Sequence, residues 1–185
     1  MTGLFGDFLQ DNPIAVSPMK IDLDRPYNLW KGTNMASKLI TVSATAQSTA
    51  SPEAVFALLA AGETWPRWSP IKTYALHTPG LDGGESVGAI RQWNSGLMMN
   101  LEQIVELQAP TKFAYTLNQS KIVGVKNYRA DVDIVSTTAG CTVTWSAVFY
   151  PKVAGTGWFW KFALGKLSNQ LATGVATYAA TPVAN

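Results

Sequence analysis

The sequence has very little of what disulfide, metal or histidine chemistry requires. It contains one cysteine, Cys141, and one histidine, His77. A lone cysteine forms no disulfide within the chain, and we interpret it as a buried thiol because free cysteine usually packs as a small hydrophobic residue. His77 lies near a strand end with no Asp or Ser beside it, which favours an exposed side chain over a catalytic one. We therefore expect neither a metal site nor a cofactor.

Charge is also scarce, because charged residues make up 14% of the chain. The 14 basic and 12 acidic residues are scattered, and no basic run of the kind that follows a phosphate backbone occurs, so nucleic acid is not an expected partner. Asp131 and Asp133 lie two residues apart in a predicted strand, and we interpret them as part of a solvated edge rather than as a cation site. No apolar stretch approaches the ~20 residues that span a bilayer, and no signal peptide is recognised. These absences predict a cytoplasmic monomer or homodimer without stable membrane insertion.

What the sequence does have is apolar residues, at 47% of the chain, with seven Trp, six Tyr and seven Phe. A chain of 185 residues with this composition supports one domain with a sizeable core. Residues 1–37 carry no sustained periodicity and are expected to form an N-terminal arm, extended or partly disordered, that lies on the domain or on a neighbouring subunit. Residues 38–185 are expected to form the domain itself.

Within the domain, the hydrophobic pattern predicts a strand, two short helices, six strands and one long helix. Ser51 and Pro52 are typical of a helix start and predict a helix over 52–61, and TWPRWSP predicts a second helical turn. The strands are expected at 39–47, 71–78, 88–94, 98–108, 112–119, 123–136 and 140–150. Short links between the later strands indicate an antiparallel meander.

The final helix is predicted from an apolar stripe that repeats every three or four residues. The stripe consists of Trp160, Leu164, Leu167, Leu171, Val175 and Tyr178, with Lys161 and Ser168 away from it. This order of elements predicts an α+β helix-grip fold, a seven-stranded curved antiparallel sheet wrapped around the long C-terminal helix. A single helix does not fill the hollow of such a sheet, so we expect an internal cavity.

The most informative polar residues lie in the hairpin around Ser95 and Gly96. A two-residue turn there pairs Trp93 with Met98 and Arg91 with Asn100. The residues that then share one face are Ala89, Arg91, Trp93, Met98, Asn100, Glu102 and Ile104. This face either lines the cavity or is exposed, with Arg91 and Glu102 as a surface pair. The opposite face is more apolar, so the pattern favours the exposed arrangement by a small margin.

Several stretches resemble the START-like superfamily (SRPBCC), and within it the polyketide cyclase/dehydrase and lipid-transport group. They are SPEAVFALLAAGETWPRWSP, GESVGAIRQWNSG, LEQIVELQAPTKFAYTL, the step Tyr128-Arg129-Ala130, and GCTVTWSAVFYPKVAGTG before the last helix. The resemblance covers about residues 38–180. It implies the helix-grip fold and a hydrophobic pocket for lipids, sterols, polyketides or other aromatic molecules.

The glycine-rich segment PGLDGGESVG resembles the loop at the same place in the birch-pollen-allergen branch of this superfamily. It lacks the Gly-Lys-Ser/Thr ending of a nucleotide-binding loop, so an ordinary turn and a lip over the cavity both remain open. The expected cavity-wall residues are Trp65, Trp68, Trp93, Met98, Asn100, Phe113, Tyr115, Tyr128, Trp145, Phe149, Trp160 and Leu164. For Trp65 and Trp68, an exposed patch for a partner or membrane surface is the alternative.

We therefore carry three hypotheses about function. The first is a carrier or sensor of a hydrophobic or aromatic small molecule such as a lipid or polyketide. The second is a polyketide cyclase/dehydratase-type enzyme in which Arg91 stabilises an enolate and Glu102 or Tyr128 transfers protons. The third is a partner-binding protein that uses the N-terminal arm. The fold implies a pocket but does not specify its chemistry. The predicted aromatic wall with few titratable groups favours the first hypothesis, a carrier or sensor.

Overall fold

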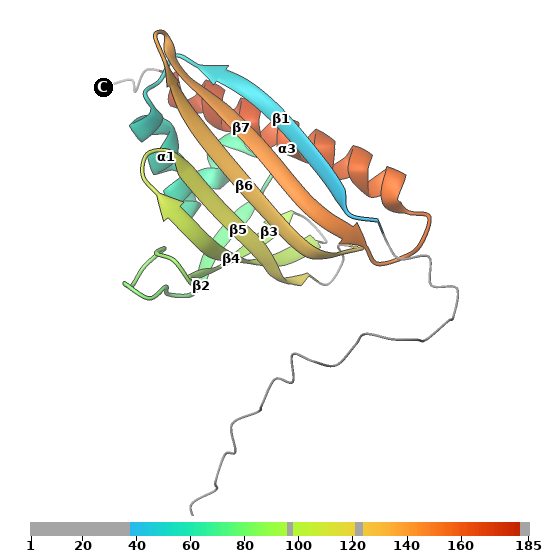
Figure 1. The fold of residues 1–185 in the computed structure, drawn as a ribbon. Coiled ribbons are helices and arrows are strands. Elements are labelled where there is room, and N and C mark those ends of the chain that lie inside the picture. The colour runs from blue at the N-terminus through green and yellow to red at the C-terminus, as the bar shows by residue number, and fades with distance from the viewer. Residues whose placement is uncertain (1–37, 96–97, 121–123, 182–185) are drawn as a thin grey trace, which may run out of the picture. The chain divides into compact units, whose positions relative to one another are not determined.

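The computed structural model describes residues 38–95, 98–120 and 124–181. The predicted N-terminal arm, residues 1–37, lies outside the described residues. The elements in chain order are β1 (Ile40–Ser48), α1 (Pro52–Ala60), the 3-10 helix η1 (Gly62–Thr64), α2 (Trp65–Trp68), β2 (Thr73–Thr78), β3 (Ile90–Ser95), β4 (Met98–Gln108), β5 (Lys112–Ser120), β6 (Val125–Thr137), β7 (Gly140–Pro151) and α3 (Gly157–Ala179) (Figure 1).

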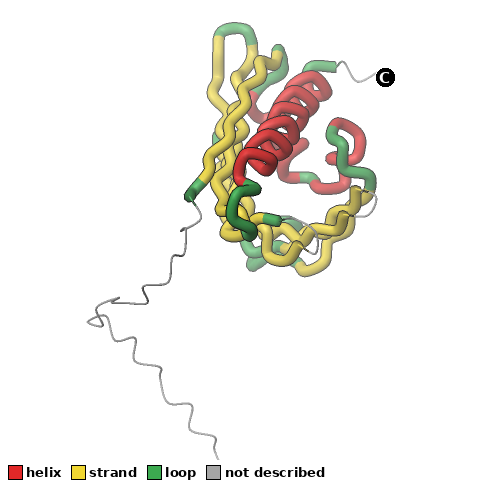
Figure 2. The backbone as a smooth tube through the Cα atoms, turned by 90° about the vertical axis from the view of Figure 1, so that its right-hand side faces the viewer, coloured by secondary structure: helices red, strands yellow, loops and turns green. Residues whose placement is uncertain are grey.

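The strands form one antiparallel sheet of seven strands in the order β1-β7-β6-β5-β4-β3-β2. The predicted meander is confirmed for β2 to β7, and the first strand, β1, pairs with the last strand, β7. The sheet curls around α3, which lies in its hollow (Figure 2). This is the predicted helix-grip arrangement, with η1 and α2 together replacing the single second helical turn.

Local sequence explains where the elements begin and which strand faces are buried. The Ser51 side chain accepts a hydrogen bond from the Ala54 backbone N–H and caps α1, while Pro52 occupies the first helical turn. Burial alternates residue by residue along β7, because successive side chains of a strand point to opposite sides of the sheet. Cys141 and Trp145 lie on the buried side, so the prediction of a buried cysteine is confirmed.

The long helix α3 differs from its predicted stripe at two positions. Ser168, predicted to lie away from the core, is buried, whereas Tyr178 is 36% exposed. The reason is that α3 packs closely against β1 as well as facing the hollow: Gly157 lies beside Ile40, and a Cβ on Gly165 would be in contact with Val42. Such close packing favours small side chains, which a search for large apolar residues overlooks.

The β3–β4 hairpin has a register two residues away from the predicted one. Arg91 is opposite Glu102, and Trp93 is opposite Asn100. A shift of two residues preserves the faces, so the predicted grouping of Arg91, Trp93 and Glu102 holds. The small preference for a surface location was wrong, because Arg91 is 1% and Glu102 8% exposed. Both faces of the hairpin carry apolar residues, and hydrophobicity alone misidentified the inner one.

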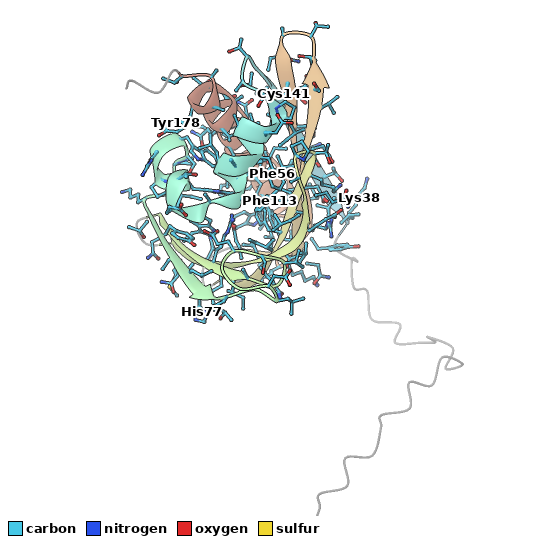
Figure 3. All side chains as sticks on the ribbon, turned by 90° about the vertical axis from the view of Figure 1, so that its left-hand side faces the viewer. Lys38, Phe56, His77, Phe113, Cys141 and Tyr178 are labelled. Carbon is cyan, nitrogen blue, oxygen red and sulfur yellow. The ribbon has the colours of Figure 1, made fainter. Side chains whose placement is uncertain are left out.

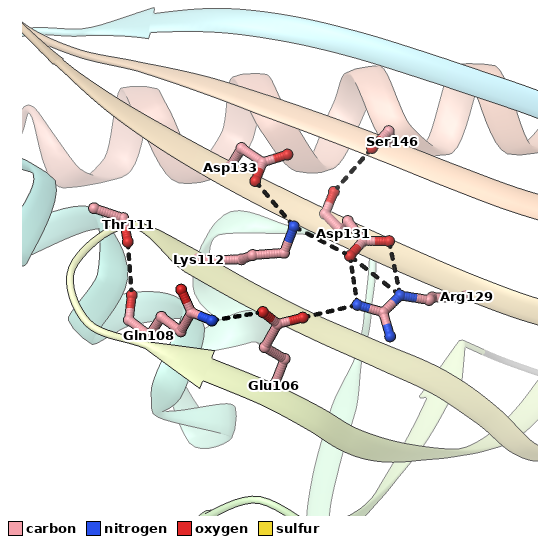
Figure 4. A network of polar contacts seen from close by, with 8 residues as sticks. All are labelled: Glu106, Gln108, Thr111, Lys112, Arg129, Asp131, Asp133 and Ser146. Atoms are coloured by element: carbon pink, nitrogen blue, oxygen red, sulfur yellow. Dashed lines mark hydrogen bonds and ion pairs between the residues drawn. The ribbon is translucent and has the colours of Figure 1, made fainter.

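His77, Asp131 and Asp133 lie at the periphery. His77 is exposed near the end of β2, far from the interior position of Phe113 (Figure 3). Asp131 and Asp133 lie on the outer face of the sheet among basic side chains (Figure 4). Among the described residues, no cluster of three or more His, Cys, Asp or Glu side chains suits a metal ion. Within the same part of the chain, no helix has the length and apolar character to cross a membrane.

Candidate functional site

A cavity of about 280 Å³ lies between the sheet and α3, and we call it the inner cavity. The residues that line it are Trp65, Pro70, Ile71, Trp93, Asn100, Glu102, Tyr115, Leu117, Tyr128, Trp160, Ala163, Leu164, Leu167, Gln170 and Leu171. A larger recess of about 500 Å³ lies elsewhere, around the start of α1 and the turn between β6 and β7, with Pro52 and Gly140 among its lining residues. We take the inner cavity as the candidate site, because small-molecule sites are concave and mostly apolar with a few polar groups.

Trp65 of α2 forms the centre of the aromatic wall of the inner cavity. Its ring stacks on Trp93 of β3, with centroids 4.8 Å apart, and meets Tyr115 of β5 edge-on at 6.2 Å. The Trp65 indole N–H donates to the Leu59 carbonyl oxygen at 3.2 Å, which anchors the ring to the end of α1. This wall is therefore assembled from a helix and two strands that are distant in sequence.

The predicted wall residues fall into two layers. Those that line the inner cavity are Trp65, Trp93, Asn100, Tyr115, Tyr128, Trp160 and Leu164. Behind them, buried in the core but not lining the cavity, are Trp68, Phe113, Trp145 and Phe149. The alternative of an exposed Trp65–Trp68 patch is excluded, since these residues are 0% and 7% exposed. The side chain of Met98 lies outside the described part of the structure.

Other lining residues were not on the predicted list. Leu117 continues the alternation of Phe113 and Tyr115 along β5, and Leu167 and Leu171 belong to the predicted stripe of α3, so their patterns contained the signal. Pro70, Ile71, Ala163 and Gln170 carried no such signal. At one end of the cavity, Gly124 permits close packing of Trp160, because a Cβ there would lie 2.6 Å from the indole ring.

Glu102 is the ionisable carboxyl group of the inner cavity. Its Oε2 atom accepts a hydrogen bond from the Trp93 indole N–H at 2.6 Å, which fixes the side chain against the wall. Burial raises the pKa of this carboxyl from 4.5 to about 7, although the Trp93 hydrogen bond and the charge of Arg91 act in the opposite direction. Near neutral pH Glu102 therefore exists in both protonated and ionised forms.

Tyr115 and Tyr128 face the same cavity from neighbouring strands, with ring centroids 6.2 Å apart. Burial raises the pKa of both phenols, and the negative charge of Glu102 acts in the same direction. Both hydroxyls consequently remain protonated at neutral pH. They place two uncharged hydrogen-bonding groups on the cavity wall.

Arg91 shares the face of Glu102 but is directed away from the inner cavity and is not among its lining residues. Its Nη1 and Nη2 atoms donate to the carbonyl oxygens of Leu59 and Ala60, at 3.1 and 2.7 Å. Its Nε atom lies 2.5 Å from Glu85 Oε2, an ion pair rather than an aligned hydrogen bond. Burial lowers the pKa of Arg91, while Glu85 and Glu102 act in the opposite direction.

The glycine-rich segment contributes through Glu85. The carboxylate of Glu85 accepts hydrogen bonds from the Gly62 backbone N–H, at 2.8 and 3.1 Å, and from the Tyr74 hydroxyl at 2.6 Å. Between Gly80 and Gly88 no residue lines the inner cavity, and Leu81 is 86% exposed. The segment thus ties η1 and β2 to Arg91, and its geometry is that of a loop beside the site.

These features, a curved antiparallel sheet that grips one long helix with a cavity between them, define a START-like helix-grip domain. A family model described as "Polyketide cyclase / dehydrase and lipid transport" matches residues 40–180, and the chain belongs to this family.

An uncharacterised protein of Mycobacterium tuberculosis is 26% identical over 104 residues, which cover 56% of this chain and 60% of that protein. The match therefore spans less than two thirds of its length. A START superfamily protein from Mycobacterium smegmatis superposes with a TM-score of 0.65 at 17% identity, covering 75% of this chain and 96% of the other. The major latex-like protein 151 of Panax ginseng gives a TM-score of 0.54 at 15% identity, covering 71% and 95%. Both likenesses establish the fold alone.

Proposed function

We propose that this domain binds a hydrophobic or aromatic small molecule in the inner cavity, as a carrier or sensor. The observation that carries the proposal is the cavity itself, which lies between the aromatic wall and α3. Its volume of about 280 Å³ is just below the usual range for small-molecule sites. The family and fold are consistent with hydrophobic ligands, while the identity of the ligand is open.

Native mass spectrometry of the protein purified from its source cells is the direct test. We expect one bound small molecule per chain, which extraction then identifies. A protein that carries nothing and binds no aromatic probe would contradict the proposal. A dependence of ligand binding or of oligomeric state on residues 1–37 would instead support the partner-binding hypothesis, and a chain truncated before Lys38 tests it.

A cavity-filling variant connects binding to this cavity. Leu167→Trp places a larger ring into the inner cavity from α3, and we expect it to weaken ligand binding by tenfold or more, about 1.4 kcal/mol. Asn169→Trp is the matched control, because Asn169 is exposed on the same helix. Titration calorimetry with the extracted ligand compares the two variants, and equal losses would place the binding site elsewhere.

One observation favours the second candidate, a cyclase/dehydratase-type enzyme. Glu102 has a pKa of about 7 and faces the inner cavity beside Tyr128, and a group with such a pKa suits general acid–base catalysis. Arg91, which lies outside the cavity lining, is not supported as an enolate-stabilising group. If the protein turns over a polyketide-like substrate, Glu102→Gln should abolish turnover while the substrate still binds.

A further inference from the structure

Among the described residues, the inner cavity is lined by an acidic side chain but by no basic one. The carboxyl group is that of Glu102, and no lysine, arginine or histidine of the described ranges contributes to the lining. The other polar side chains of the lining, those of Asn100, Tyr115, Tyr128 and Gln170, are neutral. A bound molecule therefore meets a carboxyl group and uncharged hydrogen-bonding groups, in surroundings that are otherwise apolar.

The basic residue nearest in the register is already engaged elsewhere. Arg91 is opposite Glu102, yet its guanidinium group binds the carbonyl oxygens of Leu59 and Ala60 and pairs with Glu85. With a side chain that is 1% exposed, Arg91 has no room to reorient toward a ligand. Within the part of the chain that the structure describes, the cavity consequently offers no cation to a carboxylate or a phosphate.

Glu102, by contrast, retains hydrogen-bonding capacity. Within the described residues its hydrogen bond is the one that Oε2 accepts from Trp93. An ionised carboxylate accepts about four hydrogen bonds, and the protonated form keeps part of this acceptor capacity. Because the Trp93 bond holds the side chain in place, the remaining capacity is directed at a fixed position on the cavity wall.

We propose that the ligand of this domain is an amphipathic molecule whose polar end donates a hydrogen bond to Glu102, as a hydroxyl or an amine does, and that acidic ligands are rejected. The inference rests on the proposed function and specifies its ligand class. When Glu102 is ionised, a carboxylate at this position would meet it as a like charge in a mostly apolar site and find no basic partner among the described lining residues. A hydroxyl or an amine donates a hydrogen bond to the Glu102 carboxyl group. An apolar ligand would displace water from this group without replacing the lost hydrogen bond.

Matched naphthalene probes test this preference with the full-length protein. They are 2-naphthalenemethanol, 2-naphthylmethylamine, 2-naphthoate and 2-methylnaphthalene, which share one ring system and differ in the polar group. Titration calorimetry at about pH 8, where Glu102 is mostly ionised, should give Kd values for the alcohol or the amine at least about tenfold lower than for naphthoate. The relative affinity of alcohol and amine then distinguishes a neutral from a cationic natural donor.

Two variants of the same strand make the test specific. Glu102→Gln removes the charge but keeps an oxygen that accepts from Trp93, and it should reduce the discrimination against naphthoate to about threefold or less. Glu106→Gln is the matched control, because a bulge in β4 between Ile104 and Glu106 places Glu106 on the outer face beside Arg129. Discrimination should be unchanged in this control.

The outcomes separate this inference from the proposed function. Equal affinities for the alcohol, the amine, naphthoate and methylnaphthalene would overturn the inference and leave a hydrophobic binding site. Tighter binding of naphthoate would overturn it as well. If none of the probes binds, the result contradicts both the proposed function and the inference. Lowering the pH to about 5.5 protonates Glu102 while naphthoate stays ionised, so the discrimination should also shrink in the wild-type protein.

Discussion

The sheet carries two arginine–carboxylate clusters of similar composition, on opposite faces. On the inner face Arg91 pairs with Glu85, and its side chain is 1% exposed. On the outer face Arg129 pairs with Glu106 and Asp131 at 2.8 and 2.7 Å, and its side chain is 39% exposed. Figure 4 shows the outer cluster. The same kinds of residue are thus present in a buried and in a partly exposed environment within one domain.

The two environments have opposite electrostatic consequences. Burial lowers the pKa of Arg91 and raises that of Glu102, so desolvation works against both charged forms. The outer arrangement favours charge: the hydrogen bonds that Arg129 donates to the carboxylates of Asp131 and Glu106 raise the pKa of Arg129, and the Arg129 guanidinium lowers the pKa of Asp131. Residue type therefore predicts little about these clusters until the face of the sheet is known.

The largest expected effect comes from removing the buried arginine. Arg91→Ala leaves Glu85 without its ion pair, and it removes the hydrogen bonds that Arg91 donates to the Leu59 and Ala60 carbonyl oxygens. Breaking a buried pair on one side typically costs about 3–5 kcal/mol, and we expect the free energy of unfolding to fall by about this amount. Urea denaturation of Arg91→Ala beside Arg129→Ala measures the contrast, and losses of similar size would contradict it.

A second effect concerns the pH dependence of stability. The folded-state pKa of Glu102 is about 7 against an ordinary value of 4.5, so between these pH values the folded protein binds more protons than the unfolded chain. Stability from this group is therefore present at low pH and lost as the pH rises through about 7, by on the order of 3 kcal/mol. Glu102→Gln should lack this decline and be the more stable protein at about pH 8. Urea midpoints across pH for both proteins check this, and parallel curves would refute it.

The smallest effect is expected on the outer face. Arg129→Ala removes partly exposed ion pairs with Glu106 and Asp131, and exposed pairs contribute about 1 kcal/mol or less. Added salt should shrink the difference from wild type further, because it screens exposed charges. Thermal denaturation at low and high salt measures it. A loss above about 2 kcal/mol that is insensitive to salt would mean that this cluster behaves like the buried one.

Much of this protein follows from its sequence alone. Alternation along β4 to β7, the cap at Ser51 and the stripe of α3 are local patterns, so they predicted the order of elements and the helix-grip fold. Alternation also grouped Arg91, Trp93 and Glu102 on one face, and it did so despite a register error of two residues, because side chains repeat with a period of two.

Only the tertiary structure decided which face of the β3–β4 hairpin is inside and which of its side chains reach the inner cavity. Arg91 is directed to carbonyl groups 32 and 31 residues earlier in the chain, whereas Glu102 stays on the cavity wall. The burial of Ser168 depends likewise on how closely α3 approaches β1. A periodic pattern specifies which residues share a face, but what covers that face depends on segments distant in sequence, and that covering determines burial, pKa and the polarity of the site.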